Sequence, residues 1–278
     1  MFTTLIPATE LATHLDDPDW IIFDCRHDLA DTDSGRRAYS QSHVPGARFV
    51  HLDADLSGPK TGTNGRHPLP DPEQFCARLT ALGMRNGMQA AAYDASGGCF
   101  AARLWWMLRW VGHRSCAVLD GGWDAWCKSG LPQSAELPVS TAGNFTGAAR
   151  AITVDTDYIL SGLRQRKDTI VDARSADRYR GENETLDPVG GHIPGAINRF
   201  FKDNLAADGR FKPAPTLCDE YVAMLGEKMP GSVVHQCGSG VTACHNLLAM
   251  EIAGLSGSRL YPGSWSEWCS DPARPVAR

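Results

Sequence analysis

The sequence predicts an α/β protein with two tandem domains, each a parallel sheet flanked by helices. Two observations support this fold class. The first is an internal repeat, of which each half of the chain holds one copy. The second is the order within each copy, where short apolar runs that suit buried strands alternate with longer helical patterns. Strands joined through helices lie parallel in one sheet, because the helix returns the chain to its starting edge.

Each copy of the repeat begins with an apolar strand that ends in an acidic and a basic residue. The first is Trp20–Arg26 and the second is Thr169–Arg174. A near-identical turn follows each strand, His-Val-Pro-Gly-Ala at 43–47 and His-Ile-Pro-Gly-Ala at 192–196. The turn histidine lies 19 residues after the strand's aspartate in the first copy and 20 residues after it in the second. The matching order and spacing indicate a duplicated domain.

A second strand in each copy leads into a turn and then a helix. In the first half Ala90–Tyr93 leads to Asp94, and in the second half Ser232–Gln236 leads to Cys237. A helix is expected next in each half, at Ala101–Val111 and at Val241–Ala253. After each helix come a short apolar strand and an aromatic turn, at Val118–Trp123 and at Leu260–Trp265.

The chain has 278 residues, which suffices for two compact domains. The segment 137–149 is rich in the proline, glycine and asparagine residues typical of a linker. We therefore predict a first domain at 1–138, a linker at 139–149 and a second domain at 150–278.

The composition is that of a folded globular protein, with 42% hydrophobic and 21% charged residues. A net charge of -5 provides no basic face for nucleic acid and no reason to expect an anionic membrane partner. No stretch approaches the roughly 18 apolar residues of a membrane-spanning helix, and the N-terminal residues do not resemble a secretory signal.

Nine cysteines are scattered along the chain without the spacing of a metal site. Their odd number and spacing favour free, mostly buried thiols in a reducing cytoplasm over a disulfide scaffold. A cytoplasmic protein without metal or cofactor is the expectation.

The turn that contains Cys237 is the predicted reactive site. It reads Cys237-Gly-Ser-Gly-Val-Thr242 and lies between a strand and a helix. Ligands of parallel sheets bind at the carboxyl ends of strands, and two glycines let successive N–H groups point inward. Together with the helix N-terminus, these groups favour a nucleophilic thiolate over the thiol. The alternative is an inert buried cysteine. The Gly-x-Gly spacing after Cys237, and the lack of a cysteine at the equivalent position of the first half, argue against it.

These motifs resemble the tandem-domain rhodanese family. The resemblance covers essentially 1–278 and rests on both His-x-Pro-Gly-Ala turns, on Gly263-Ser-Trp265, and on the 237–242 loop, which resembles that of the 3-mercaptopyruvate sulfurtransferase branch. It implies two rhodanese-like domains, a catalytically inactive first and an active second, with the site in the cleft between them. Asp94 stands where the first domain would need a cysteine, and a carboxylate cannot accept sulfane sulfur.

The resemblance also implies site residues. Catalysis would involve Cys237 as nucleophile, with Ser239, His67 and Asp55 as an acid–base relay. The substrate would bind to Arg178 and to the loop residues, Gly238, Gly240, Val241 and Thr242. From the sequence alone His67 reads equally well as a surface histidine. The family's second substrate arginine has no counterpart, since 182–188 contains no basic residue.

The expected function is transfer of sulfur from 3-mercaptopyruvate, through a Cys237 persulfide, to an acceptor. That acceptor would be cyanide, thioredoxin or a low-molecular-weight thiol. A thiosulfate sulfurtransferase is the alternative, and a non-catalytic rhodanese binding module is a further one. A cysteine phosphatase is excluded because the position six after Cys237 is Ala243, where the phosphate-binding arginine would stand.

Other prominent residues receive structural interpretations. Cys244 is expected to pack against the sheet, and Trp105, Trp106 and Trp110 to belong to the core. Glu182, Glu184 and Asp187 are expected to form a solvated acidic loop.

Overall fold

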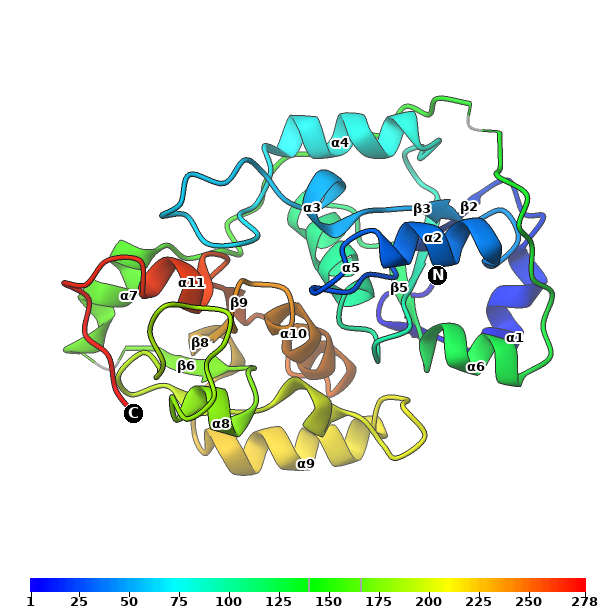
Figure 1. Cartoon of the computed structure of the whole chain (residues 1–278). Coiled ribbons are helices and arrows are strands. Elements are labelled where there is room, and N and C mark those ends of the chain that lie inside the picture. Colours follow the sequence, from blue (N-terminus) through cyan, green and yellow to red (C-terminus); the bar gives the residue numbers. More distant parts are fainter. Residues whose placement is uncertain (140, 166) are drawn as a thin grey trace. The chain divides into compact units, whose positions relative to one another are not determined.

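The computed structural model describes residues 1–139, 141–165 and 167–278. The chain forms two compact units (Figure 1). The first unit comprises 1–58, 70–150 and 207–210, and the second comprises 59–69, 151–206 and 211–278. Each unit therefore includes a short segment from the other half of the sequence.

The first unit is built on a parallel sheet with strand order β1-β5-β4-β2-β3. Its strands are β1 (Leu5–Ile6), β2 (Trp20–Asp24), β3 (Arg48–Phe49), β4 (Gln89–Tyr93) and β5 (Cys116–Leu119). Strands β4 and β5 are buried along their whole length, as expected for a sheet covered on both faces.

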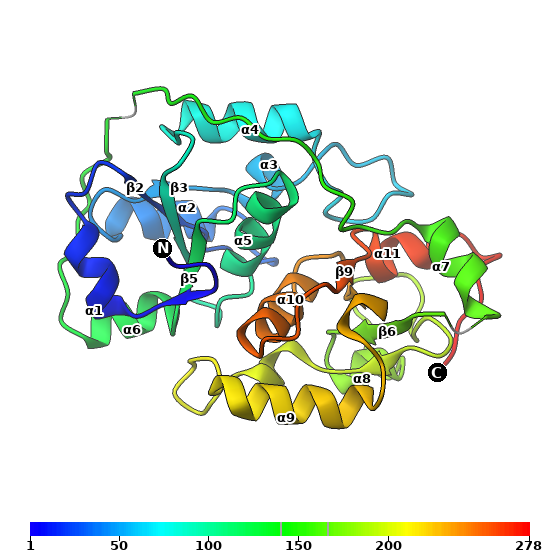
Figure 2. The same ribbon diagram turned by 180° about the vertical axis from the view of Figure 1, so that it is seen from behind.

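Helices cover both faces of the first unit's sheet, as Figure 2 shows. On one face α1 and α6 pack against alternate strand residues in a core that includes Leu11, Ile22 and Trp126. On the other face α5 packs against β4 and β5. The helices of this unit are α1 (Ala8–Leu11), α2 (Ser34–Gln41), α3 (Leu52–Asp55), α4 (Pro72–Ala81), α5 (Ala101–Trp110) and α6 (Gly122–Lys128). A 3-10 turn at Ala12–His14 follows α1.

The second unit is built on a parallel sheet with strand order β7-β6-β8-β9. Its strands are β6 (Thr169–Asp172), β7 (Ile197–Asn198), β8 (Val233–Gln236) and β9 (Arg259–Leu260). The central strands β6 and β8 correspond to β2 and β4 of the first unit, so the duplication in the sequence is present in the structure.

Helices α9 and α10 cover one face of this sheet, and α7 and α11 cover the other (Figure 1). The second core contains Ile159 of α7, Val234 of β8 and Trp265 of α11. The helices of this unit, with 3-10 turns at Phe201–Asn204 and Pro230–Ser232, are α7 (Thr156–Leu163), α8 (Ala176–Tyr179), α9 (Ala214–Leu225), α10 (Ala243–Ile252) and α11 (Ser264–Trp268).

The duplicated motifs form the same contacts in each unit. Arg26 binds Asp24 and lies 4.6 Å above the ring of Trp123, while Arg174 binds Asp172 and lies 4.8 Å above the ring of Trp265. In both units the arginine therefore ties the end of a central strand to the aromatic turn.

The predicted α/β class and the parallel sheets are confirmed. Helix α10 begins at Ala243, two residues later than predicted, and the two-residue strands β1, β3 and β7 were not predicted. Cys244 and the three tryptophans of α5 are buried, as expected. Within the described residues, no helix combines the length and apolarity needed to cross a membrane.

Candidate active site

Cys237 lies directly after β8, at the carboxyl end of the central strand, and is 2% exposed. Its Sγ accepts a hydrogen bond from the backbone N–H of Gly240, with an N–S distance of 3.1 Å. Its own N–H donates to Ser264 Oγ at 3.1 Å, and its carbonyl accepts from Trp265 N–H at 3.0 Å. The first two residues of α11 therefore fix the backbone that presents the sulfur.

The loop can take this shape because Gly240 has no side chain. Its φ is +78°, and a Cβ there would lie 2.4 Å from the carbonyl oxygen of Pro262. Ser264, in the facing turn, has a φ of 54°, and a left-handed non-glycine residue is a feature of strained functional sites. The close approach of these two turns directs the Gly240 N–H toward the sulfur.

Ser239 and His67 are in direct contact. His67 Nδ1 and Ser239 Oγ are 2.7 Å apart, and the two residues are 5% and 7% exposed. Both belong to the second unit, because the segment 59–69 packs there. Gly65, with a φ of +86°, lets this segment approach the start of α11 closely, because a Cβ at Gly65 would lie only 2.8 Å from the carbonyl oxygen of Gly263. His67 is thus a buried partner of the cysteine loop and not a surface histidine.

Arg178 lies beside the same loop. A Cβ on Gly238 would lie 3.6 Å from Arg178 Nη1 and 3.5 Å from its Nη2. The Arg178 side chain is 19% exposed, and its Nη2 binds Glu184 Oε1 at 2.8 Å. The Arg178 guanidinium is therefore within van der Waals distance of a side chain at position 238, and it is placed where an anion at the loop would meet it.

The predicted solvated acidic loop is wrong for two of its three residues. The side chains of Glu184 and Asp187 are 3% exposed and bind arginines, whereas Glu182 is 56% exposed, as expected. Burial acts to raise the pKa of Glu184, but Arg178 and the N–H groups of Leu186 and Asp187 together outweigh it, so this pKa lies below its ordinary value. The sequence shows the acidic residues of this loop, but it does not show which arginines elsewhere in the chain bind them.

Arg66 is the residue of this region that the sequence did not suggest. Its Nη2 lies 2.7 Å from the position a Gly238 Cβ would occupy, and its Nη1 donates to Asp187 Oδ1. The only signal in the sequence was its position next to His67.

Comparisons with known proteins show to which family the chain belongs. The family model described as a rhodanese-like domain matches residues 7–129 and 155–271. The chain belongs to the rhodanese family. Its tandem organisation and its relatives, which are named sulfurtransferases, identify it as a sulfurtransferase.

Individual relatives cover nearly all of this rhodanese. A probable 3-mercaptopyruvate sulfurtransferase of Pseudomonas aeruginosa is 46% identical over 276 residues, which are 98% of this chain and 97% of the relative. A putative thiosulfate sulfurtransferase of Mycobacterium tuberculosis is 37% identical over 99% of this chain and 96% of its own length. The 3-mercaptopyruvate sulfotransferase SseA of Escherichia coli superposes with a TM-score of 0.83 at 32% identity, covering 95% of this chain and 99% of that chain.

The other predicted site residues of this rhodanese lie as follows. Asp55 is a buried residue of the first unit, where its carboxylate accepts from His51 N–H at 2.8 Å and from Arg78 Nε at 2.6 Å. Val241 is 4% exposed, and Thr242 occupies the N-cap position of α10. The roles predicted for these residues remain predictions.

Arg174 is a further charged neighbour of the loop. Burial acts to lower the pKa of Arg174, but Asp172, Glu184 and Cys237 attract its positive charge more strongly and raise it above the ordinary value. Arg174 is committed to Asp172 Oδ2 at 2.6 Å and to the carbonyl of Gly191 at 2.7 Å. This arginine therefore supports the loop.

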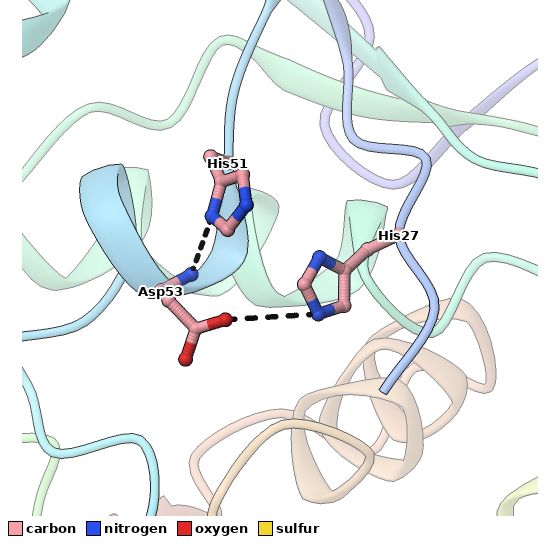
Figure 3. Close-up of side chains that lie close together, drawn as sticks. All are labelled: His27, His51 and Asp53. Carbon is pink, nitrogen blue, oxygen red and sulfur yellow. Dashed lines mark hydrogen bonds and ion pairs between the residues drawn. The ribbon is translucent and has the colours of Figure 1, made fainter. Parts of the chain in front are cut away.

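Within the described residues, a group of possible metal ligands lies in the first unit: His27, His51 and Asp53 (Figure 3). His51 uses both ring nitrogens, since Nδ1 accepts from the N–H groups that begin α3 and Nε2 lies 3.0 Å from the carbonyl of Thr32. Only His27 and Asp53, 3.8 Å apart, then remain as ligands. Two protein ligands are fewer than structural or catalytic zinc sites use, so this group fits a capped helix terminus better than a metal centre.

Proposed function

We propose that this sulfurtransferase takes sulfane sulfur from 3-mercaptopyruvate, holds it as a Cys237 persulfide and passes it to cyanide, thioredoxin or a low-molecular-weight thiol. In this proposal the second domain, 150–278, is catalytic and the first, 1–138, is not. The observation that supports it best is the set of contacts at the loop, where Gly240 N–H meets the sulfur and His67 meets Ser239.

In the first half-reaction the Cys237 thiolate attacks the sulfur of 3-mercaptopyruvate. The new S–S bond forms as the C–S bond breaks, and the electron pair of that bond leaves on the enolate of pyruvate. The donor's thiol proton must then reach the enolate carbon. The Ser239–His67 pair, 2.7 Å apart, can move that proton, and Asp55 is proposed to support the relay.

In the second half-reaction the acceptor takes the outer sulfur. A thiolate or cyanide attacks this atom, the S–S bond breaks, and its electron pair returns to Cys237 as a thiolate. The inward N–H groups of the loop stabilise the charge as it moves between the two sulfurs. We propose that Gly238, Gly240, Val241 and Thr242 shape this anion site, and that Arg178 binds the donor's carboxylate.

Thiosulfate is the alternative donor, since several relatives are named thiosulfate sulfurtransferases. Thiosulfate carries two negative charges and no thiol proton, so it needs positive charge and no relay. The loop has no basic side chain at 238 or 239 and has a serine–histidine pair, which favours mercaptopyruvate.

The test is to measure kcat/KM for 3-mercaptopyruvate and thiosulfate on the same preparation, with cyanide as the acceptor. We expect mercaptopyruvate to be preferred, and mass spectrometry after donor alone to show Cys237 heavier by one sulfur atom. A preference for thiosulfate would establish the alternative donor. Absence of any sulfur adduct with either donor would favour a non-catalytic module.

A cytoplasmic location is also proposed. All nine cysteines are free thiols in the structure, as suits a reducing compartment.

A further inference from the structure

Gln236, the last residue of β8, carries a buried amide directly before Cys237. Its side chain is fully buried, and neither Oε1 nor Nε2 has a hydrogen-bond partner among the described residues. Roughly nine in ten buried polar groups in proteins are paired, with a protein group or with an ordered water, because an unpaired group costs free energy. The Gln236 amide is therefore expected to bind a partner from outside the chain.

The equivalent residue of the first unit shows which groups meet at this point of the fold. Tyr93 ends β4 and pairs with Asp24 in the sheet, just as Gln236 ends β8 and pairs with Asp172. The Tyr93 hydroxyl donates to Asp24 Oδ2 at 2.6 Å and accepts from the N–H of Val44 at 3.2 Å. This hydroxyl therefore bridges the carboxylate of one strand and the turn at 43–47.

The second unit keeps both ends of that bridge but has no hydroxyl between them. Ile193 corresponds to Val44 and is fully buried, and its N–H has no acceptor in the described part of the chain. The Asp172 carboxylate is also fully buried, and within the same residues it accepts hydrogen bonds from Arg174 alone. One donor and one acceptor thus remain for a further molecule.

The side chain of Gln236 lies on the same side of the sheet as this pair of groups. Residues two apart in a strand share a face, and Val234 packs in one core with Ile193. Tyr93 packs with Val44 in the corresponding core of the first unit. A glutamine is shorter and smaller than a tyrosine, so its amide ends before the place that the hydroxyl takes in the first unit.

We propose that the second unit binds one internal water molecule at this place, where it performs the bridging role of the Tyr93 hydroxyl. The water accepts from Ile193 N–H, donates to Asp172 Oδ2 and makes a third hydrogen bond with the Gln236 amide. Three bonds are typical of an internal water, and the amide can supply its bond through either the oxygen or the nitrogen. The water thereby ties the end of β8 to the turn at 192–196.

The charges around the place favour a neutral ligand. Arg174 already neutralises the Asp172 carboxylate through Nη2 at 2.6 Å, so a cation would bring an uncompensated charge into a buried place. An anion would be repelled by the same carboxylate. The site does not depend on which sulfur donor the enzyme uses.

The first test is a high-resolution crystal structure of the whole chain. We expect density for one water within about 3.2 Å of Ile193 N, of Asp172 Oδ2 and of an amide atom of Gln236. An amide that bonds protein groups alone, with no water at this place, would overturn the proposal.

The second test exchanges the two residues between the units and counts long-lived internal waters by magnetic relaxation dispersion of water oxygen. Gln236→Tyr supplies the hydroxyl, so the count should fall by one from the wild-type value. Tyr93→Gln is the matched converse in the first unit and should raise the count by one, which keeps the test open if Gln236→Tyr fails to fold. An unchanged count in either folded variant would contradict the water-binding role of this position.

Discussion

The turn after β4 in the first unit and the turn after β8 in the second occupy equivalent positions, but different side chains accept hydrogen bonds there. In the first unit the Asp94 carboxylate is fully buried and accepts four backbone N–H groups at 2.7–2.9 Å, those of Ser96, Gly98, Phe100 and Ala101. In the second unit the Cys237 sulfur accepts one, from Gly240 at 3.1 Å. At the four matching positions of the second unit, the N–H groups of Ser239, Val241 and Ala243 have no acceptor among the described residues, and that of Cys244 donates to the carbonyl of Val241 at 3.0 Å.

The comparison indicates what the proposed catalytic turn would require. The first unit supplies its own carboxylate, so its turn has no N–H groups left for a ligand's charge. In our proposal the second unit leaves N–H groups for a charge that arrives with the substrate or develops on the persulfide. On that proposal one position, aspartate or cysteine, separates a structural turn from a reactive one.

The largest expected effect is loss of the nucleophile. Cys237→Ser should reduce sulfur transfer to cyanide from either donor by more than about 10³-fold, because a hydroxyl cannot accept sulfane sulfur. Cys244→Ala is the matched control, since Cys244 is fully buried and is the second residue of α10, the helix that follows the Cys237 loop. It should lower stability and leave most of the activity. Retention of more than a few per cent of activity in folded Cys237→Ser would contradict the persulfide.

The second prediction concerns the first unit's turn at Asp94, whose N–H groups bind the Asp94 carboxylate. Asp94→Ala should lower the free energy of unfolding by about 3–5 kcal/mol, because four buried N–H groups lose their acceptor. Cys237→Ala, at the matching position, should cost only about 1 kcal/mol, because a single weak contact is lost. Urea unfolding, with amide exchange of α5 and α10 to locate the change, provides the measurement. Equal losses in both variants would show that the two turns do not differ in this way.

Much of this comparison was predictable from the sequence. The repeat placed Asp94 and Cys237 at equivalent strand ends, because alternating strands and helices of matched spacing leave little freedom in a parallel sheet. The buried hydrogen-bond network around Asp94 was not predicted, and it makes this residue more than a polar turn residue. A side chain can accept hydrogen bonds from the N–H groups at the start of a helix only where the backbone curves around it, and the residue types do not specify this curvature.

The charged half of the site was harder to predict. Arg66 and Asp187 are 121 residues apart in sequence, and their pairing depends on the packing of 59–69 in the second unit. A sequence with several acidic residues in a loop predicts exposed side chains, because most acidic side chains in proteins are exposed to solvent. Burial of Glu184 and Asp187 follows only from partners that no local pattern identifies.

The third prediction tests what the second unit adds beyond the cysteine. Ser239→Ala should lower kcat with 3-mercaptopyruvate by about 10²-fold, because the enolate loses its proton source, and should change thiosulfate turnover little. His67→Ala should show the same donor-selective loss, since it contacts Ser239. Steady-state kinetics with both donors checks this. Parallel losses for both donors in Ser239→Ala would mean that Ser239 only shapes the loop.

The smallest expected effect concerns a buried base that only one of the central strands carries. His235 of β8 is fully buried, with Nε2 3.1 Å from Met250 Sδ, whereas the matching residue of β4 is Ala92. Burial lowers the pKa of His235 from 6.5 to about 3. The unfolded chain therefore binds the proton first, so the stability contributed by the neutral ring is complete above about pH 6.5 and is lost as the pH falls toward 3.

Between pH 7 and pH 5 this loss should reach about 2 kcal/mol of unfolding free energy. His235→Leu should remove it, so the difference between the two proteins isolates the ring from other groups. That difference is needed because burial also lowers the pKa of His27 and His113 in the first unit. Urea titrations of both proteins at the two pH values measure the effect. Equal losses in both proteins would show that protonation of His235 does not destabilise the second sheet.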